Sequence, residues 1–302
     1  MKRRKFLQGS VGAIGFGGMV PLIAQGAAPV NDQGERIADR WYDVETGRMR
    51  KPVRRRREQY DVAVIGGGMA GVCAAIASAR NGAKTVLVQD RPVLGGNASS
   101  EIRVNVNGAR RKGGFPERET GIIEEILLAN RFYNPQESYS VWDHVIYDLV
   151  VREPLLTVML NTQAIDAVVD GDVIRSAVCW QGTTETELII DAKYFIDCSG
   201  DGLLAAAAGA TYRTGREARS EFNEQYAPEK ADGWQMGASI LLHGRDMGRP
   251  IPYTPPSFAI KYDPSKANKR TIKTFEDGYW WVELGSDDDI IADYETIRHK
   301  LL

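Results

Sequence analysis

The sequence has few of the residues from which disulfide frameworks, metal centres and histidine-based active sites are built. It contains three cysteines and three histidines in 302 residues. Cys73, Cys179 and Cys198 have neither the pairing of a disulfide framework nor the spacing of a metal site. We expect Cys73 and Cys198, which lie in apolar segments, to be reduced core residues. No residue has a spacing that assigns it a catalytic role, and we predict no metal site.

A strong excess of charge of one sign is also missing. The formal net charge is −2, and without its first 30 residues the chain keeps 34 basic and 40 acidic side chains. A balanced or mildly acidic chain gives no electrostatic reason to bind nucleic acid, so we predict no nucleic-acid partner. The apolar stretch from Val11 to Ile23 is too short and too rich in glycine for a transmembrane helix.

Residues 1–30 are expected to be an export signal rather than part of the fold. Arg3 and Arg4 are followed by Phe6 and Leu7, and small residues follow the apolar stretch. This arrangement resembles a twin-arginine signal, which implies recognition by the twin-arginine translocase and a periplasmic or extracellular location. A basic disordered tail is the alternative.

Residues 31–59 are predicted to be a polar linker that leads into the fold. The segment ends in the basic run Arg54–Arg57. Such a run is typical of a solvated segment, and contact with anionic lipid is the alternative.

The strongest signal in the chain is a glycine-rich turn between an apolar strand and a helix of small residues. Val62–Ile65 predicts a buried parallel strand, and residues 66–71 then fit the pattern G-x-G-x-x-G. The first glycine permits a tight turn, the second lets backbone approach a pyrophosphate, and the third lets the helix pack closely on the sheet. N–H groups at the helix start favour an anion. We predict dinucleotide contacts at Gly66, Gly68, Met69, Ala70 and Gly71.

A second strand, Thr85–Val88, ends about 20 residues after the glycines, where a group that binds ribose hydroxyls is expected. That group is usually acidic, whereas this sequence has Gln89, whose amide can bond a hydroxyl without a charge. Asp90 is the alternative, although consecutive strand residues point to opposite faces.

The loop that follows separates a flavin from a nicotinamide nucleotide. Residues 89–104, QDRPVLGGNASSEIRV, are most similar to the broad group of FAD-dependent oxidoreductases. The loop resembles that of flavoproteins with two dinucleotide-binding domains, such as fumarate reductase-like and glutathione reductase-like enzymes. The resemblance implies FAD as the cofactor, with Arg91, Gly95, Gly96 and Asn97 along the pyrophosphate and towards the isoalloxazine ring.

Charged and polar residues then form a loop that we expect over the cofactor. Glu101, Arg103, Asn105 and Asn107 are candidates for substrate or flavin contacts, and solvated loop residues are the alternative. Apolar spacing predicts helices over 120–130 and 140–151.

Strands are predicted from residue 155 onward, over 155–160, 164–169, 173–180, 186–190 and 194–197. They form a β-meander inserted between parallel strands. The resemblance implies that backbone of the segment Asn161-Thr162-Gln163-Ala164 holds the adenine, with Gln163 and Ala164 as the predicted contacts. It also implies that Ser199, Gly200 and Asp201 pass beside the FAD, where Asp201 accepts from hydroxyls. A short helix is predicted over 203–210.

The sequence therefore predicts an α/β fold. A Rossmann-like FAD-binding domain with a parallel sheet and an inserted β-meander spans 60–232, and an incomplete α+β substrate domain spans 233–302. Strands are predicted over 234–243 and 278–283 and a helix over 287–302. Because members with this pattern are roughly twice as long, we expect the chain to be C-terminally truncated. A homo-oligomer or a partner chain could complete the fold.

The function that the resemblance implies is an oxidoreductase in which FAD exchanges a hydride with a small organic or carbohydrate-like substrate. Two alternatives stay open. One is a non-catalytic flavin-binding remnant or binding module, and the other is a nicotinamide-dependent dehydrogenase.

Overall fold

The computed structural model describes residues 54–106, 119–261, 263, 278–284 and 288–302. The proposed signal and all but the last six residues of the proposed linker lie outside these ranges. The chain divides into two compact units, one ending at Gly209 and the other beginning at Ala210. The sequence predicted a boundary after residue 232, whereas this division assigns residues 210–232 to the second unit.

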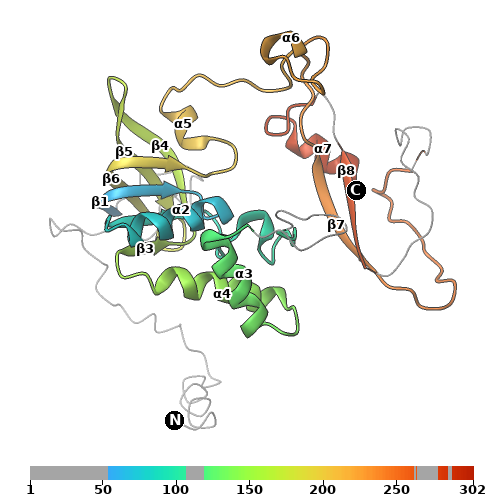
Figure 1. Cartoon of the computed structure of the whole chain (residues 1–302). Helices are drawn as coiled ribbons and strands as arrows, with labels where there is room; N and C mark the ends of the chain where they lie inside the picture. Colours follow the sequence, from blue (N-terminus) through green and yellow to red (C-terminus); the bar gives the residue numbers. More distant parts are fainter. Residues whose placement is uncertain (1–53, 107–118, 262, 264–277, 285–287) are drawn as a thin grey trace, which may run out of the picture. The chain divides into compact units, whose positions relative to one another are not determined.

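The first unit is built on one sheet with the strand order β3-β2-β1-β6-β5-β4. β1, β2, β3 and β6 pair in parallel, while β4 and β5 pair antiparallel with each other and β5 with β6. This confirms the predicted α/β fold with an inserted meander (Figure 1). The strands are β1 (Arg54–Ile65), β2 (Thr85–Val88), β3 (Leu156–Met159), β4 (Thr162–Asp170), β5 (Val173–Gln181) and β6 (Thr186–Asp197).

β6 corrects one prediction, because residues 186–197 form one continuous strand rather than two. Its first half pairs antiparallel with β5, and its whole length pairs in parallel with β1. The same strand therefore closes the meander and runs on, so that its carboxyl end lies beside that of β1.

β1 corrects another prediction, because it begins at Arg54, inside the predicted linker. Arg55 is paired with Glu187 at 2.6 Å, and Arg57 with Asp191 at 2.6 Å, across the parallel β1–β6 ladder. Alternate residues of a strand share a face, so two acids on β6 meet two arginines of the run. The run is exposed, as expected, but it is strand rather than linker.

Alternation along β1 divides the core between the two faces of the sheet. Val62 and Val64 pack with α2 (Met69–Arg80), α3 (Gly121–Tyr133) and α4 (Tyr139–Val151), which Figure 1 shows together on one side. Ala63 and Ile65 pack with the antiparallel strands and α5 (Leu203–Ala207). The small residues of α2 let this helix lie close to the strands.

The second unit contains α6 (Arg219–Phe222), a two-stranded antiparallel sheet of β7 (Ala238–Gly244) and β8 (Gly278–Leu284), and α7 (Tyr294–Leu301). Both predicted strands are present, and the predicted last helix begins later than expected. Within the described part of the chain, no helix has the length and apolar character needed to cross a bilayer.

Candidate dinucleotide-binding site

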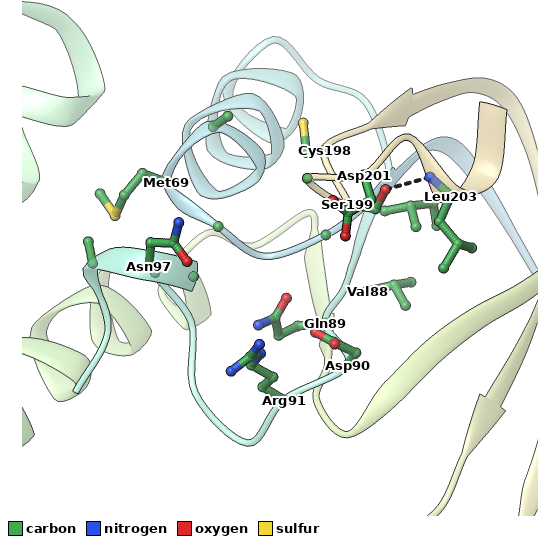
Figure 2. A pocket seen from close by; sticks show the side chains of 18 of the residues that line it. Met69, Val88, Gln89, Asp90, Arg91, Asn97, Cys198, Ser199, Asp201 and Leu203 are labelled. Carbon is green, nitrogen blue, oxygen red and sulfur yellow. Dashed lines mark hydrogen bonds between the residues drawn. The ribbon is translucent and has the colours of Figure 1, made fainter. Parts of the chain in front are cut away.

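A cavity of about 720 Å³ lies at the carboxyl ends of β1, β2 and β6 (Figure 2). Ligands of open α/β sheets bind at this edge, and the volume is within the usual range for small-molecule sites. Fifteen of the sixteen residues predicted as cofactor contacts line it: Gly66, Gly68, Met69, Ala70, Gln89, Asp90, Arg91, Gly95, Gly96, Asn97, Gln163, Ala164, Ser199, Gly200 and Asp201. The sixteenth, Gly71, does not line the cavity.

Three glycines of the turn after β1 are required by the protein itself. Gly66 has a φ of +101°, and a Cβ there would lie 2.2 Å from Cys198 O. A Cβ on Gly71 would lie 1.8 Å from Gly66 O, and one on Gly67 would lie 2.7 Å from Leu94 Cδ2. The contacts at Gly66 and Gly71 are with backbone oxygens and exclude a side chain, whereas at Gly67 the side chains of Leu94 and Gln89 would have to shift to admit one. These glycines therefore allow α2, β6 and the loop after β2 to pack on the turn.

Gly68 is different, because no protein atom explains its missing side chain. Its φ is −65°, and a Cβ would have Gly96 Cα, at 4.0 Å, as its nearest neighbour. Gly68 lines the cavity and directly precedes the first residue of α2. The space beside it fits a group that approaches the backbone closely at a helix N-terminus, as a pyrophosphate does.

The two glycine-rich loops lie directly against each other. Gly95 N donates to Gly67 O at 2.8 Å, and Gly68 and Gly95 form a parallel bridge. A Cβ on Gly96 would lie 3.0 Å from Gly68 Cα. The structure therefore brings together two motifs that are about 30 residues apart in the sequence, and both border the same cavity.

Gln89 holds these loops in place through its amide. The residue is buried, with 3% of its surface exposed. Its Oε1 accepts the Gly67 N–H at 2.7 Å, and its Nε2 donates to Val93 O at 3.1 Å. The amide predicted to bind ribose therefore has protein partners on both sides. The neighbouring Asp90 carboxylate is exposed at the cavity.

The predicted adenine-binding segment lies next to the end of β2. Thr162 N donates to Gln89 O at 2.8 Å, and Asn161 N donates to Arg91 O at 3.2 Å. These bonds place Gln163 and Ala164 in the same part of the cavity wall as Asp90 and Arg91. Thr162, which belongs to the segment predicted to hold the adenine, also lines the cavity.

The turn after β6 is organised by one carboxylate, Asp197. Its Oδ1 accepts the Ser199 N–H at 2.9 Å and the Ser199 hydroxyl at 2.7 Å, and its Oδ2 accepts Ala205 N–H at 2.9 Å. Ser199 Oγ in turn accepts Leu203 N–H at 2.8 Å, the dashed bond in Figure 2. Burial alone would raise the pKa of Asp197. Hydrogen bonds from Ser199 and from backbone N–H groups have a larger effect in the opposite direction, so the pKa lies below its usual value.

The cysteines are thiols with raised pKa values. Burial is the main cause in all three, and it raises the pKa of Cys179 to about 12. Cys198 lines the cavity, but burial and then the charge of Asp197 raise its pKa, so it is a poor nucleophile. Cys73 and Cys198 are partly buried against the core. The described residues contain no group of three or more acidic, cysteine or histidine side chains placed to hold a metal.

Comparisons with known proteins give partial matches. The chain is 29% identical over 155 residues to the tRNA uridine 5-carboxymethylaminomethyl modification enzyme MnmG of a Nitratiruptor species, covering 47% of this chain. It spans about a quarter of that relative, 24% of its length.

Two solved structures illustrate the structural comparison. THI4 of Thermovibrio ammonificans is 21% identical with a TM-score of 0.36, over 57% of this chain and 76% of that one. A geranylgeranyl bacteriochlorophyll reductase-like protein of Thermoplasma acidophilum is 20% identical with a TM-score of 0.37, over 52% and 43%.

The family comparison covers most of the chain. Residues 61–292 match the model of the FAD dependent oxidoreductases, a range that includes both glycine-rich loops and the turn after β6. Every predicted cofactor contact falls inside it. The chain belongs to the FAD-dependent oxidoreductase family.

Proposed function

We propose that the protein uses FAD to exchange a hydride with a small organic or carbohydrate-like substrate. The observation that carries the proposal is Gly68, whose missing side chain leaves cavity space that no protein atom occupies. FAD supplies the redox chemistry when bound, and the residues of this chain bind and orient it.

The cavity wall offers a separate group of residues for each part of the dinucleotide. The backbone of Gly68–Ala70 would receive the pyrophosphate at the start of α2, with Gly96 opposite. Asp90, Arg91 and the segment 163–164 would hold the adenosine part. In this arrangement Asp90, rather than Gln89, offers a carboxylate to the ribose hydroxyls, because the Gln89 amide already bonds both loops.

The turn after β6 favours a flavin over a nicotinamide nucleotide. Ser199, Gly200 and Asp201 border the same cavity as Gly95–Asn97, so the two segments that carry the flavoprotein resemblance meet at one site. Asp201 is exposed there and would accept from hydroxyls of the ligand.

An absorbance spectrum of the purified protein tests the proposal. We expect flavin bands, and the same bands in the supernatant after heat denaturation and centrifugation, which would establish non-covalent FAD. Reduction of the bound flavin by candidate alcohols or sugars would then identify the substrate class. Bound flavin that no donor reduces would favour the binding module, and a colourless protein that binds NADH but not added FAD would favour the dehydrogenase.

Export by the twin-arginine translocase is a separate proposal, and it rests on Arg3 and Arg4 in the sequence. Loading of a cofactor before export gives this route a physical reason, because the translocase carries folded proteins. We expect the double substitution Arg3→Lys and Arg4→Lys to keep the charge and retain the protein in the cytoplasm. Equal amounts of both proteins in the periplasmic fraction would contradict the proposal.

Association with a second copy or a partner chain is the last part of the proposal. It is supported by the exposed side chains of Met236, Leu242 and Tyr253 in the second unit. Light scattering after size-exclusion chromatography would detect it, and a monomer at all concentrations would contradict self-association.

A further inference from the structure

The loop that follows β2 forms one wall of the cavity but belongs to no sheet. From Gly95 onward, seven of its residues line the cavity: Gly95, Gly96, Asn97, Ala98, Val104, Asn105 and Val106. It folds back on itself, with Val104 N donating to Asn97 O at 2.9 Å and a left-handed φ of +63° at Arg103. A loop of this shape leaves backbone groups without ladder partners, and these groups need other partners.

One face of α4 supplies those partners. Tyr139, Trp142 and Asp143, here called the α4 triplet, lie at helical positions i, i+3 and i+4 and therefore on one side of the helix. Trp142 Nε1 donates to Ala98 O at 2.7 Å, and Asp143 Oδ1 accepts the Ser100 N–H at 2.9 Å.

Tyr139 bonds the far end of the same loop. Its hydroxyl lies 3.1 Å from Arg103 O and 2.9 Å from Asn105 Oδ1, and the Arg103 guanidinium lies 5.5 Å from the centre of its ring. One turn further along α4, Ile146 Cδ1 would lie 3.1 Å from a Cβ on Gly95. The helix therefore contacts the loop from Gly95 to Asn105.

α4 is itself fixed by the core. Trp142, Val145, Ile146 and Val150 are buried, and Trp142 is 7% exposed as a residue. Hydrogen bonds to such a helix restrict the conformational freedom of the loop. A precise binding site requires supporting side chains whose rotamers are fixed by packing, as those of α4 are.

We propose that the α4 triplet consists of positioning residues that hold loop 97–106 against the flavin part of the cofactor and orient Asn105 towards the ligand. The proposal rests on the proposed function, since it assumes FAD with its adenosine part near Asp90 and Gln163. The triplet makes no described hydrogen bond to either of these residues. The loop that it holds reaches the adenosine part through Glu101, which pairs with Arg91 at 3.0 Å on the exposed surface. An exposed pair of this kind contributes little, so the triplet acts mainly on the flavin part of the site.

Two ligands separate a positioning role from a general structural one. ADP carries only the adenosine and phosphate part, whereas FAD carries the flavin as well. For Tyr139→Phe, which removes one hydroxyl, we expect FAD affinity to fall about five- to tenfold, as for the loss of one or two hydrogen bonds, with ADP affinity unchanged. The visible circular dichroism of bound flavin should change as well.

Asp143 allows a rescue experiment. Asp143→Asn keeps Oδ1 as an acceptor for the Ser100 N–H and should bind FAD as the wild type does, while Asp143→Leu should lose affinity as Tyr139→Phe does. Tyr147→Phe is the matched control, because Tyr147 lies on the same helix, is exposed, and has no described contact with the loop. It should change nothing.

The outcomes are distinct. Parallel losses of FAD and ADP affinity with a lower melting temperature, or no change in either affinity or in the flavin spectrum, would overturn the positioning role and leave the proposed function intact. A wild-type protein that binds ADP but no FAD would instead refute the proposed function, and the inference would fail with it.

Discussion

The turns after β1 and after β6 lie side by side and border the same cavity, yet they keep their shapes by opposite means. The turn after β1 depends on missing side chains, since a Cβ on Gly66 or Gly71 would lie within 2.2 Å or 1.8 Å of a backbone oxygen. The turn after β6 depends on a side chain that is present, because Asp197 accepts three hydrogen bonds from residues that follow it.

This difference determines how each turn responds to change. Packing without charge is insensitive to pH and intolerant of added atoms. A carboxylate that accepts several hydrogen bonds tolerates nearby substitutions but depends on its charge. Substitutions in the two turns should therefore differ in their effect on the free energy of unfolding.

Gly71→Ala should destabilise the fold most. The new methyl would lie 1.8 Å from Gly66 O, so α2 would have to move away from the turn. We expect a loss of about 3 kcal/mol or more in the free energy of unfolding, at the upper end of overpacking. Urea denaturation followed by circular dichroism measures it. A loss below about 1 kcal/mol would mean that the turn relaxes easily and does not depend on the missing side chain.

Asp197→Ala should cost about 2–3 kcal/mol at pH 7, because it removes a charged acceptor from three N–H or O–H groups. Asp197→Asn should cost less, since one oxygen remains. The folded-state pKa of Asp197 lies below its unfolded value, so its stabilisation is complete above about pH 4 and is lost as pH falls through the folded pKa.

The measurement is denaturation of wild type and Asp197→Asn between pH 7 and pH 3. The difference in stability between them should shrink below about pH 4. A difference that stays constant over this range would show that the charge of Asp197 does not hold the turn.

Gln89→Glu tests whether the first turn also needs a polar side chain. The substitution keeps an acceptor for the Gly67 N–H but replaces the donor to Val93 O with an oxygen. We expect a loss of about 1–2 kcal/mol, the cost of a buried group left without its partner. Gln89→Met, which removes both bonds, is the matched comparison, and equal stability of all three proteins in urea would contradict the role of the amide.

Gly68→Ala should leave the free energy of unfolding within about 0.5 kcal/mol of wild type, because the φ of −65° suits alanine and the nearest atom would lie at 4.0 Å. Its effect should appear in binding. FAD affinity should fall about 10- to 100-fold, since the methyl occupies space that we assign to the pyrophosphate.

Fluorescence titration with FAD measures this effect, with Gly71→Ala as the opposite case in the same turn. A Gly68→Ala protein that binds FAD as tightly as the wild type would remove the main support for the proposed cofactor position.

The local elements of the first unit could be predicted because each has a short-range physical cause. Apolar runs predicted β2 and the last four residues of β1, and helical spacing predicted α3 and α4 to within a few residues. The G-x-G-x-x-G pattern predicted which backbone would line a cavity, since only glycines permit its close approaches. Where short-range interactions alone determine the conformation, the local sequence is sufficient to predict it.

Pairing between distant segments could not be predicted. The basic run at Arg54–Arg57 has the composition of a linker, and it is a strand because its backbone pairs with β6, whose Glu187 and Asp191 also form ion pairs with two of its arginines. Gln89 has the position of a ribose ligand, but the tertiary fold gives its amide two backbone partners from different loops. The α4 triplet has the pattern of an ordinary helix face, and only the folded loop gives it a role.

The sequence by itself determined the class of fold, the flavin-type motifs and the edge of the sheet where they meet, because hydrophobic period and glycine spacing follow from local sterics and the motifs follow the carboxyl ends of parallel strands. The glycine pattern also predicted that Gly66 and Gly71 serve the packing of the protein and that Gly68 leaves room for a ligand, and tertiary structure added Gly67, where a Cβ would lie 2.7 Å from Leu94 Cδ2. Tertiary structure alone decided which polar side chains hold loops rather than face the cavity. Those properties depend on distances between atoms of residues far apart in the chain, which no local pattern contains.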